Sequence, residues 1–158
     1  MSDGVKITGH ISWEMTHANG TIEKGNKQNV ITDYGKKWIA SILGTGITIG
    51  TWFGFGTSST SAAVGNTILA AELSTSGTGY GRITTTKGWT NGTAIVQYQG
   101  TLTGLTSTGL TTIREVGIFA GLTNGATGVT IIARQTTGDI QFTSSLDSLA
   151  ITWQVTFS

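Results

Sequence analysis

The last ten residues constrain the fold more than any other stretch of this chain. Large apolar side chains alternate there with small or polar ones, in the order Leu149, Ile151, Trp153, Val155 and Phe157. A period of two places every large apolar group on one face of a β-strand. Such a strand has to be tied into a sheet, because a free terminal segment would otherwise fray. Residues 149–157 are therefore expected to pack one strand face on a core.

The composition predicts many short strands joined by tight turns. Only 11% of the 158 residues are charged, Gly counts 24, and Thr is more frequent still. Thr suits a pleated sheet because its β-branched side chain restricts χ1 in a way that a strand tolerates. The chain has no Pro, so Gly, Asn, Ser and Thr have to build the turns. The length fits a single domain over residues 1–158.

Strands are expected at regular intervals along the chain. They are marked by alternating or β-branched residues at 5–13, 21–24, 29–32, 51–56, 82–89, 93–102, 112–120, 129–136, 140–143 and 149–157. The dipeptide Asn19-Gly20 predicts a hairpin with a type I′ turn between the first two. This pattern indicates a mainly β fold, an antiparallel β-sandwich or jelly-roll-like domain. Residues 1–31 are expected to form a hairpin or arm that contacts a neighbouring molecule.

One short α-helix is expected in the N-terminal third. Thr32 or Asp33 can cap its N-terminus, and Gly44 supplies a C-terminal stop. An apolar face at helical spacing joins Tyr34, Trp38, Ile39, Ile42 and Leu43. A second short helix is expected over residues 66–73, with Asn66 or Thr67 as its cap.

The composition also narrows the classes of function. Cys is absent, which excludes disulfides and thiolate metal sites. The net charge of +1 provides no concentrated basic face for nucleic acid. No apolar run approaches the ~20 residues of a membrane span, and no signal peptide is visible at the start. We therefore expect synthesis in the cytoplasm, and no nucleic acid, membrane or cofactor as a partner.

Three segments carry a distinctive order of residues. The first, at 29–40, reads Asn-Val-Ile-Thr-Asp-Tyr-Gly-Lys-Lys-Trp-Ile-Ala. The second joins Phe-Gly-Phe-Gly-Thr at 53–57 to Thr-Ile-Leu-Ala-Ala-Glu-Leu at 67–73. The third joins Thr-Ile-Arg-Glu-Val-Gly-Ile-Phe at 112–119 to Ala-Arg-Gln at 133–135 and Asp-Ser-Leu-Ala-Ile-Thr-Trp at 147–153. In this order the segments resemble a family of tailed-bacteriophage virion proteins, although the loop after Gly56 lacks the Pro common in such loops.

This resemblance, which spans about residues 29 to 158, implies a structural component of the virion and no enzymatic activity. The leading expectation is a capsid decoration or cement protein, a homotrimer that also contacts other virion proteins such as the major capsid protein. The alternative is a tail-fibre or baseplate-associated component, for which a host-surface glycan is a possible ligand.

Charged residues stand in otherwise apolar stretches. Arg114 and Glu115 are adjacent in an expected strand, so they point to opposite faces and need partners elsewhere. The candidate partners are Arg82, Arg134 and Glu72. We interpret these five residues as Arg–carboxylate bridges that fix loops to the sheet, because bidentate pairing suits that role. The other interpretation, an acid–base pair of Glu72 and Glu115, has no accompanying sign of a cleft.

Other catalytic and metal-binding patterns are weaker. His10, Glu14 and His17 could be read as metal ligands, but their spacing matches no zinc pattern, and we expect no metal site. No nucleophile elbow or complete phosphate-binding loop occurs, so no catalytic residue is assigned.

The five Trp residues raise the question of stacking on a sugar or partner. Trp38 and Trp153 lie on expected apolar faces, which indicates a role in the core. Trp52 and Trp89 are less constrained and are the candidates for a surface or partner contact.

Overall fold

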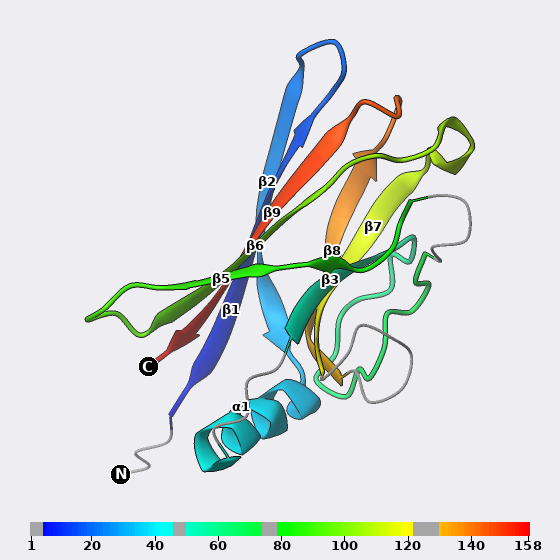
Figure 1. Cartoon of the computed structure of the whole chain (residues 1–158). Helices are drawn as coiled ribbons and strands as arrows, with labels where there is room; N and C mark the ends of the chain where they lie inside the picture. The colour runs from blue at the N-terminus through cyan, green and yellow to red at the C-terminus, as the bar shows by residue number, and fades with distance from the viewer. Residues whose placement is uncertain (1–4, 46–49, 74–78, 122–129) are drawn as a thin grey trace.

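Nine antiparallel strands form one sheet, with one α-helix beside it, in the computed structural model, which describes residues 5–45, 50–73, 79–121 and 130–158 (Figure 1). The strands are β1 Ile7–Thr16, β2 Ile22–Ile31, β3 Gly50–Gly56, β4 Ile83–Thr84, β5 Thr86–Trp89, β6 Ile95–Leu102, β7 Thr112–Gly121, β8 Thr130–Gln141 and β9 Ser148–Phe157. The helix α1 spans Asp33–Thr45, and a 3₁₀ turn, η1, spans Ser107–Gly109. The expected mainly β fold with a helix in its N-terminal third is confirmed.

The sheet curls until its two ends almost meet. Its strand order is β4-β3-β7-β8-β2-β1-β9-β6-β5, so the end strands β4 and β5 are consecutive in the chain. Only Thr85 separates them, and its N–H donates to Thr51 O at 3.0 Å. The strand expected over 82–89 is therefore split at Thr85. The residues before Thr85 pair with β3, and those after it pair with β6. The result is barrel-like.

Strand β2 links the two halves of this sheet. It pairs with β1 from Ile22 to Asn29, and it reaches β8 only through Val30 and Ile31. Strand β1 in turn pairs with β9 along its whole length, from Ile7 to Thr16. The first hairpin is thus an integral part of the sheet and leaves one long edge of β2 without a neighbouring strand among the described residues.

The turn between β1 and β2 differs from the expected type I′ turn. His17 and Thr21 close a three-residue loop, with His17 N–H donating to Thr21 O at 2.9 Å. Gly20 has a φ of 85°, whereas no residue other than Gly has a positive φ in the described chain. A type I′ turn needs a positive φ at Asn19 as well, so the loop follows the alternative hairpin geometry with a left-handed Gly at its end.

Thr32 caps the N-terminus of helix α1, as expected: its Oγ1 accepts a hydrogen bond from Gly35 N–H at 2.9 Å. Tyr34 and Leu43 were expected on its buried face but are 45% and 83% exposed. The helix instead turns Gly35 toward β8, where a side chain would collide with Ile132 O. Gly44 lies within the helix without a positive φ, so the expected C-terminal stop is wrong.

The second expected helix, over 66–73, is also wrong. This segment forms turns and an isolated bridge between Glu72 and Gly56. Its N–H groups are used elsewhere: Leu73 N–H donates to Phe55 O, and those of Ala70 and Ala71 donate to the Glu115 carboxylate. Tertiary hydrogen bonds therefore replace the local ones that a helix would need.

Strand β8 unites two strands that were expected separately. Its pairing with β7 shifts register between Ile113 and Glu115, where three residues of β8 lie opposite one of β7. Gly138 sits in this bulge with a φ of 83°. The break between the strands expected at 129–136 and 140–143 is thus a bulge within one strand.

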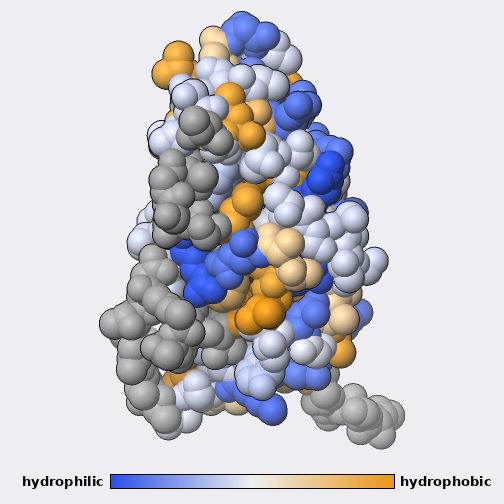
Figure 2. All heavy atoms as spheres, turned by 90° about the vertical axis from the view of Figure 1, so that its right-hand side faces the viewer, coloured by the Kyte–Doolittle hydropathy of each residue, from blue (hydrophilic) through white to orange (hydrophobic). Residues whose placement is uncertain are grey.

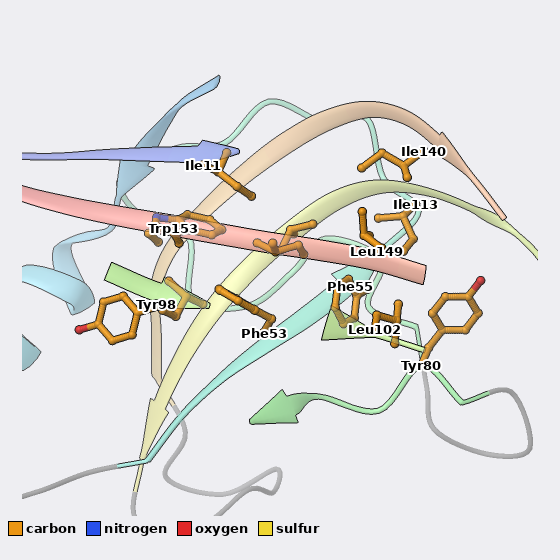
Figure 3. Close-up of a cluster of buried hydrophobic side chains, with 14 of the residues drawn as sticks. Ile11, Phe53, Phe55, Tyr80, Tyr98, Leu102, Ile113, Ile140, Leu149 and Trp153 are labelled. Carbon is orange, nitrogen blue, oxygen red and sulfur yellow. The ribbon is translucent and has the colours of Figure 1, made fainter. Parts of the chain in front are cut away.

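The core lies inside the curled sheet, and Figure 3 shows side chains from both halves of the sheet converging on it, among them Ile11, Phe53 and Trp153. Phe53 of β3 stacks on Trp153 of β9, with ring centroids 6.2 Å apart and planes at 25°. Trp153 is fully buried, which confirms its expected core role, and Trp38 packs against the same cluster from α1. The apolar face of β9 therefore forms one side of the core, as expected.

Candidate functional site

A buried ion pair lies between β7 and β8. Arg134 Nε donates to Glu115 Oε2 at 2.7 Å, and the two side chains are 1% and 0% exposed. Burying two charges is costly unless their remaining hydrogen-bonding atoms also find partners. The surroundings of this pair supply those partners.

Both charged groups bind the backbone of residues 57–73, which cross the outer side of β3, β7 and β8. The N–H groups of Ala70 and Ala71 donate to Glu115, at 3.1 and 2.7 Å. Arg134 donates to Thr60 O at 2.8 Å and to Ser61 O at 3.1 Å. We call Glu115, Arg134 and this segment the loop clamp.

The loop clamp covers a small second core. Leu69 packs with Phe119 of β7 and Ile131 of β8, and all three are buried. The strand residue Gly117 makes room for Leu69, since a Cβ there would lie 2.9 Å from Leu69 Cδ2. The segment is thus held by apolar packing as well as by charge.

A second ion pair fastens the end of the same segment. Arg82 binds Glu72 through two hydrogen bonds, Nε to Oε1 at 2.7 Å and Nη2 to Oε2 at 3.0 Å. Its guanidinium also lies 3.7 Å from the centroid of the Phe119 ring. Figure 2 shows this side of the molecule, where hydrophobic residues form only small separate patches among polar ones.

Arg114 pairs with a residue that the sequence analysis did not name. Its Nε donates to Asp139 Oδ1 at 2.8 Å on the surface, and this hydrogen bond lowers the pKa of Asp139. Asp139 lies in the β8 bulge, opposite Arg114. The five charged candidates therefore form two separate pairs, Glu72–Arg82 and Glu115–Arg134, and Arg114 stands apart from both.

Asp147 is a buried carboxylate whose role the sequence analysis missed. It accepts hydrogen bonds from the N–H groups of Thr143, Ala18 and Ser144, at 2.7, 2.8 and 3.0 Å. Burial acts to raise its pKa, but these donors, with His17 Nδ1 at 3.3 Å, bring the pKa to about 2. Asp147 thus ties the β1–β2 turn to the turn before β9.

The residues considered as metal ligands do not converge. Glu14 pairs with Lys24 at 2.8 Å, His10 is exposed on another part of β1, and His17 contacts Asp147 and Glu23. Within the described ranges, no group of His, Cys, Asp or Glu has a geometry suited to a metal ion.

The outer face of β2, β1, β9 and β6 is polar and almost uncharged. The register places mostly polar residues on this face, with Ala150, Ile22 and Ile95 as its apolar members; the polar ones are Thr8, His10, Ser12, Glu14, Thr16, Lys24, Asn26, Gln28, Gln97, Gln99, Thr101, Ser148, Thr152, Gln154 and Thr156. Glu14 and Lys24 are its ion pair. A shallow depression of about 460 Å³ lies beside this pair, over Ser12, Asn26 and Thr152. Interface centres in proteins are likewise poor in charged residues.

The two Trp candidates for partner contact have different environments. Trp52 is 7% exposed and covers Gly50, so it offers little surface to a ligand. Trp89 is 62% exposed at the end of β5, and its Nε1 donates to Thr93 O at 2.9 Å. Trp89 is therefore the aromatic residue of this pair that a partner could reach.

Compared with known protein families, curated proteins and solved structures, the chain has no match. In the part of the chain that the structure describes, no helix is both long and apolar enough to cross a membrane.

Proposed function

We propose that this protein is an accessory structural protein of a bacteriophage particle. In the leading version it is a decoration or cement protein of the capsid, a homotrimer that bridges neighbouring subunits of the major capsid protein. The resemblance of residues 29–158 to virion proteins is the starting point for this proposal. Under it, the barrel-like sheet is a variant of the β-sandwich or jelly-roll type.

The observation that carries the proposal is how four ionisable residues of the region 29–158 are paired. Glu72, Arg82, Glu115 and Arg134 are all engaged in pairs that fasten the chain to itself. Glu115 has both oxygens occupied by donors from Arg134 and from the backbone of residues 70–71. This arrangement favours a rigid building block, in which these residues preserve shape, over acid–base chemistry.

The surface supplies features that suit contact with neighbouring subunits. The open edge of β2 exposes backbone groups with which a strand of another chain can pair. The almost uncharged polar face adjoins this edge and can form hydrogen bonds while desolvating a single ion pair, Glu14–Lys24. Each bound copy would stabilise only the assembled shell, so the shell's stability rises with occupancy by mass action.

The alternative function is a component of a tail fibre or baseplate that binds a host-surface glycan. Trp89 favours this version, because an exposed aromatic ring can stack on a sugar. A glycan array with the Trp89→Ala variant as control would test it directly.

The number of copies per particle separates the two versions. Quantitative mass spectrometry of purified particles should find this protein in many copies on the head for a decoration protein. Copies in threes or sixes at the tail would instead support the alternative. Absence from purified particles would overturn both versions.

A surface variant tests the contact face. The Thr152→Lys substitution places an unpaired charge in the centre of the polar face and should lower incorporation into particles at unchanged stability. The matched control is Thr136→Lys on β8, which lies outside that face. Equal incorporation of both variants would remove the polar face from the proposal.

A further inference from the structure

An apolar pocket of about 260 Å³ opens between α1 and the ends of β5, β6 and β9. Ile39 and Ile42 line it on the helix side, and Val96 and Val155 line it on the sheet side. In Figure 1 this region lies between the helix and the end of the sheet where β1 begins and β9 finishes. Ligand pockets in proteins commonly measure roughly 300–1,000 Å³, so this one suits a molecule smaller than a typical drug.

The sheet side of the pocket is a continuation of the inner, core-facing surface. Register places Val96 opposite Val155, Val155 opposite Gly9, and Gly9 opposite Asn29. Residues directly opposite in antiparallel strands share a face. One row of side chains therefore runs from the pocket into the interior as far as Asn29.

Four residues have buried side-chain polar atoms without a partner among the described residues: Trp38 in the pocket, Asn29 and Trp153 on the inner surface of the sheet, and Tyr80 at the other end of the core. Trp38, which lines the pocket, has its Nε1 buried with no hydrogen-bond partner in the described chain. Trp153 Nε1 and both side-chain polar atoms of Asn29 are likewise buried without a hydrogen-bond partner among the described residues. Trp153 is 0% exposed and Asn29 is 7% exposed. An unsatisfied buried donor or acceptor costs about 1–3 kcal/mol, so a polar ligand atom that supplied a partner would be favoured.

Tyr98 adds a hydroxyl to the pocket wall. It is 5% exposed, pairs in register with Trp153, and lines the pocket. Figure 3 shows its hydroxyl pointing out of the cluster of core side chains, toward the side where the helix lies. Burial raises the pKa of Tyr98 to about 12, so the hydroxyl stays protonated and can donate.

We propose that this pocket binds a small aliphatic molecule that ends in a hydrogen-bond-accepting oxygen. The aliphatic chain lies between Ile39 and Ile42 of α1 and Val96 and Val155 of the sheet, and the oxygen accepts from the Tyr98 hydroxyl. Lys87 also lines the pocket, so a carboxylate probe is compared with a neutral one. This binding activity goes beyond the structural role and does not depend on it.

Titration of the ¹⁵N-labelled protein with 1-octanol and with sodium octanoate tests the proposal. The indole N–H resonance of Trp38 should shift and saturate, while that of Trp52, buried in another part of the molecule, should not move. Tyr98→Phe should weaken binding several-fold, and Ile42→Trp, which fills the pocket from the helix, should abolish the saturable shift. Gln99→Ala, on the outer face of β6, is the control and should bind like the wild type. Thermal melts establish that each variant is folded.

The comparison of the two probes identifies the head group. If octanoate binds the wild type more tightly than 1-octanol does, and Lys87→Ala removes this difference, the head group is a carboxylate. If the two probes bind equally well to the wild type and to Lys87→Ala, the head group is a neutral oxygen. A shift that stays linear up to the solubility limit, or unchanged binding in Ile42→Trp, would overturn the site. Unchanged affinity in Tyr98→Phe would overturn the hydroxyl contact. Sedimentation showing that probes bind only after copies of the chain dissociate would identify an interface and refute a ligand pocket.

Discussion

Arg134 and Glu115 form an ion pair at 2.7 Å that is closed to solvent on all sides, and their remaining donors and acceptors bind the backbone of one surface segment. The pair therefore does two things: it joins β7 to β8 and it holds residues 57–73 on the outside of the sheet. A buried pair is weak support for stability by itself, but the loss of one member leaves the other charged and without its partner.

Glu115→Gln should be among the most destabilising single changes in the chain. Removing one member of a buried pair costs about 3–5 kcal/mol, and the amide also offers a weaker acceptor to Ala70 and Ala71 N–H. Urea denaturation should show the loss, and limited proteolysis should show earlier cleavage within residues 57–73.

Arg114→Gln is the matched control for this change. Arg114 is adjacent to Glu115 in β7, but its pair with Asp139 is on the surface, where ion pairs contribute little. A Glu115→Gln protein with the wild-type urea midpoint would contradict the clamp, and would reopen the acid–base interpretation of Glu72 and Glu115.

Arg82→Lys should destabilise the protein less than Glu115→Gln does. Lysine keeps the charge but loses the two-point contact with Glu72 and the flat stacking on Phe119. Contacts of these kinds contribute about 1–2 kcal/mol in partly exposed sites. Arg114→Lys, which changes a two-point surface pair with no aromatic neighbour, provides the comparison by urea denaturation. Equal effects of the two substitutions would show that the Phe119 contact contributes nothing.

The parts of the fold that were predictable from sequence are those whose signal is local. The alternation of apolar and polar residues over 149–157 is sufficient to predict β9, because a period of two matches a strand with one buried face and does not match a helix. The expected helix at 66–73 failed for the opposite reason. The carboxylate that binds Ala70 and Ala71 N–H comes from Glu115, 45 and 44 residues away in the chain. No local pattern encodes such a contact.

For the charged residues too, the sequence indicated part of the arrangement and the tertiary structure decided the rest. Their presence in apolar stretches indicated that Glu115 and Arg134 need partners, but the choice of partner depends on strand register. Arg114 meets Asp139 only because the β8 bulge places Asp139 opposite it. Asp147 was missed because its partners are backbone N–H groups from two turns, including that of Ala18, 129 residues away.

Gly35→Ala should loosen the attachment of α1. A Cβ at this position would lie 2.1 Å from Ile132 O, a backbone atom of β8 that has little freedom to move. Displacement of the helix should cost about 1–3 kcal/mol, the usual range for overpacking. Gly44→Ala in the same helix meets no atom within 4 Å, and should stabilise the protein by up to about 1 kcal/mol through helix propensity. Thermal melts of both variants check the opposite signs, and a loss in both would contradict the close approach of α1 to β8.

Asp147→Asn should reveal the stability that this carboxylate contributes, and the effect should depend on pH. The folded-state pKa of Asp147 is about 2, below its ordinary value of 3.8, so the unfolded chain binds more protons between these values. The stabilisation is therefore complete above about pH 4 and is lost as the pH falls through about 2. At neutral pH the amide cannot replace a charged acceptor of three N–H groups, so we expect a loss of about 1–3 kcal/mol.

Urea denaturation of the wild type and Asp147→Asn across the acidic range measures this dependence. The difference in the free energy of unfolding between the two proteins should be retained down to about pH 4 and should shrink below it. Glu14→Gln is the control, because Glu14 is 41% exposed and pairs with the more exposed Lys24. A difference between wild type and Asp147→Asn that persists unchanged at the acid end would mean that the hydrogen bonds of Asp147 do not depend on its charge. In that case protonated Asp147 would still hold the β1–β2 turn to the turn before β9 through its hydrogen bonds.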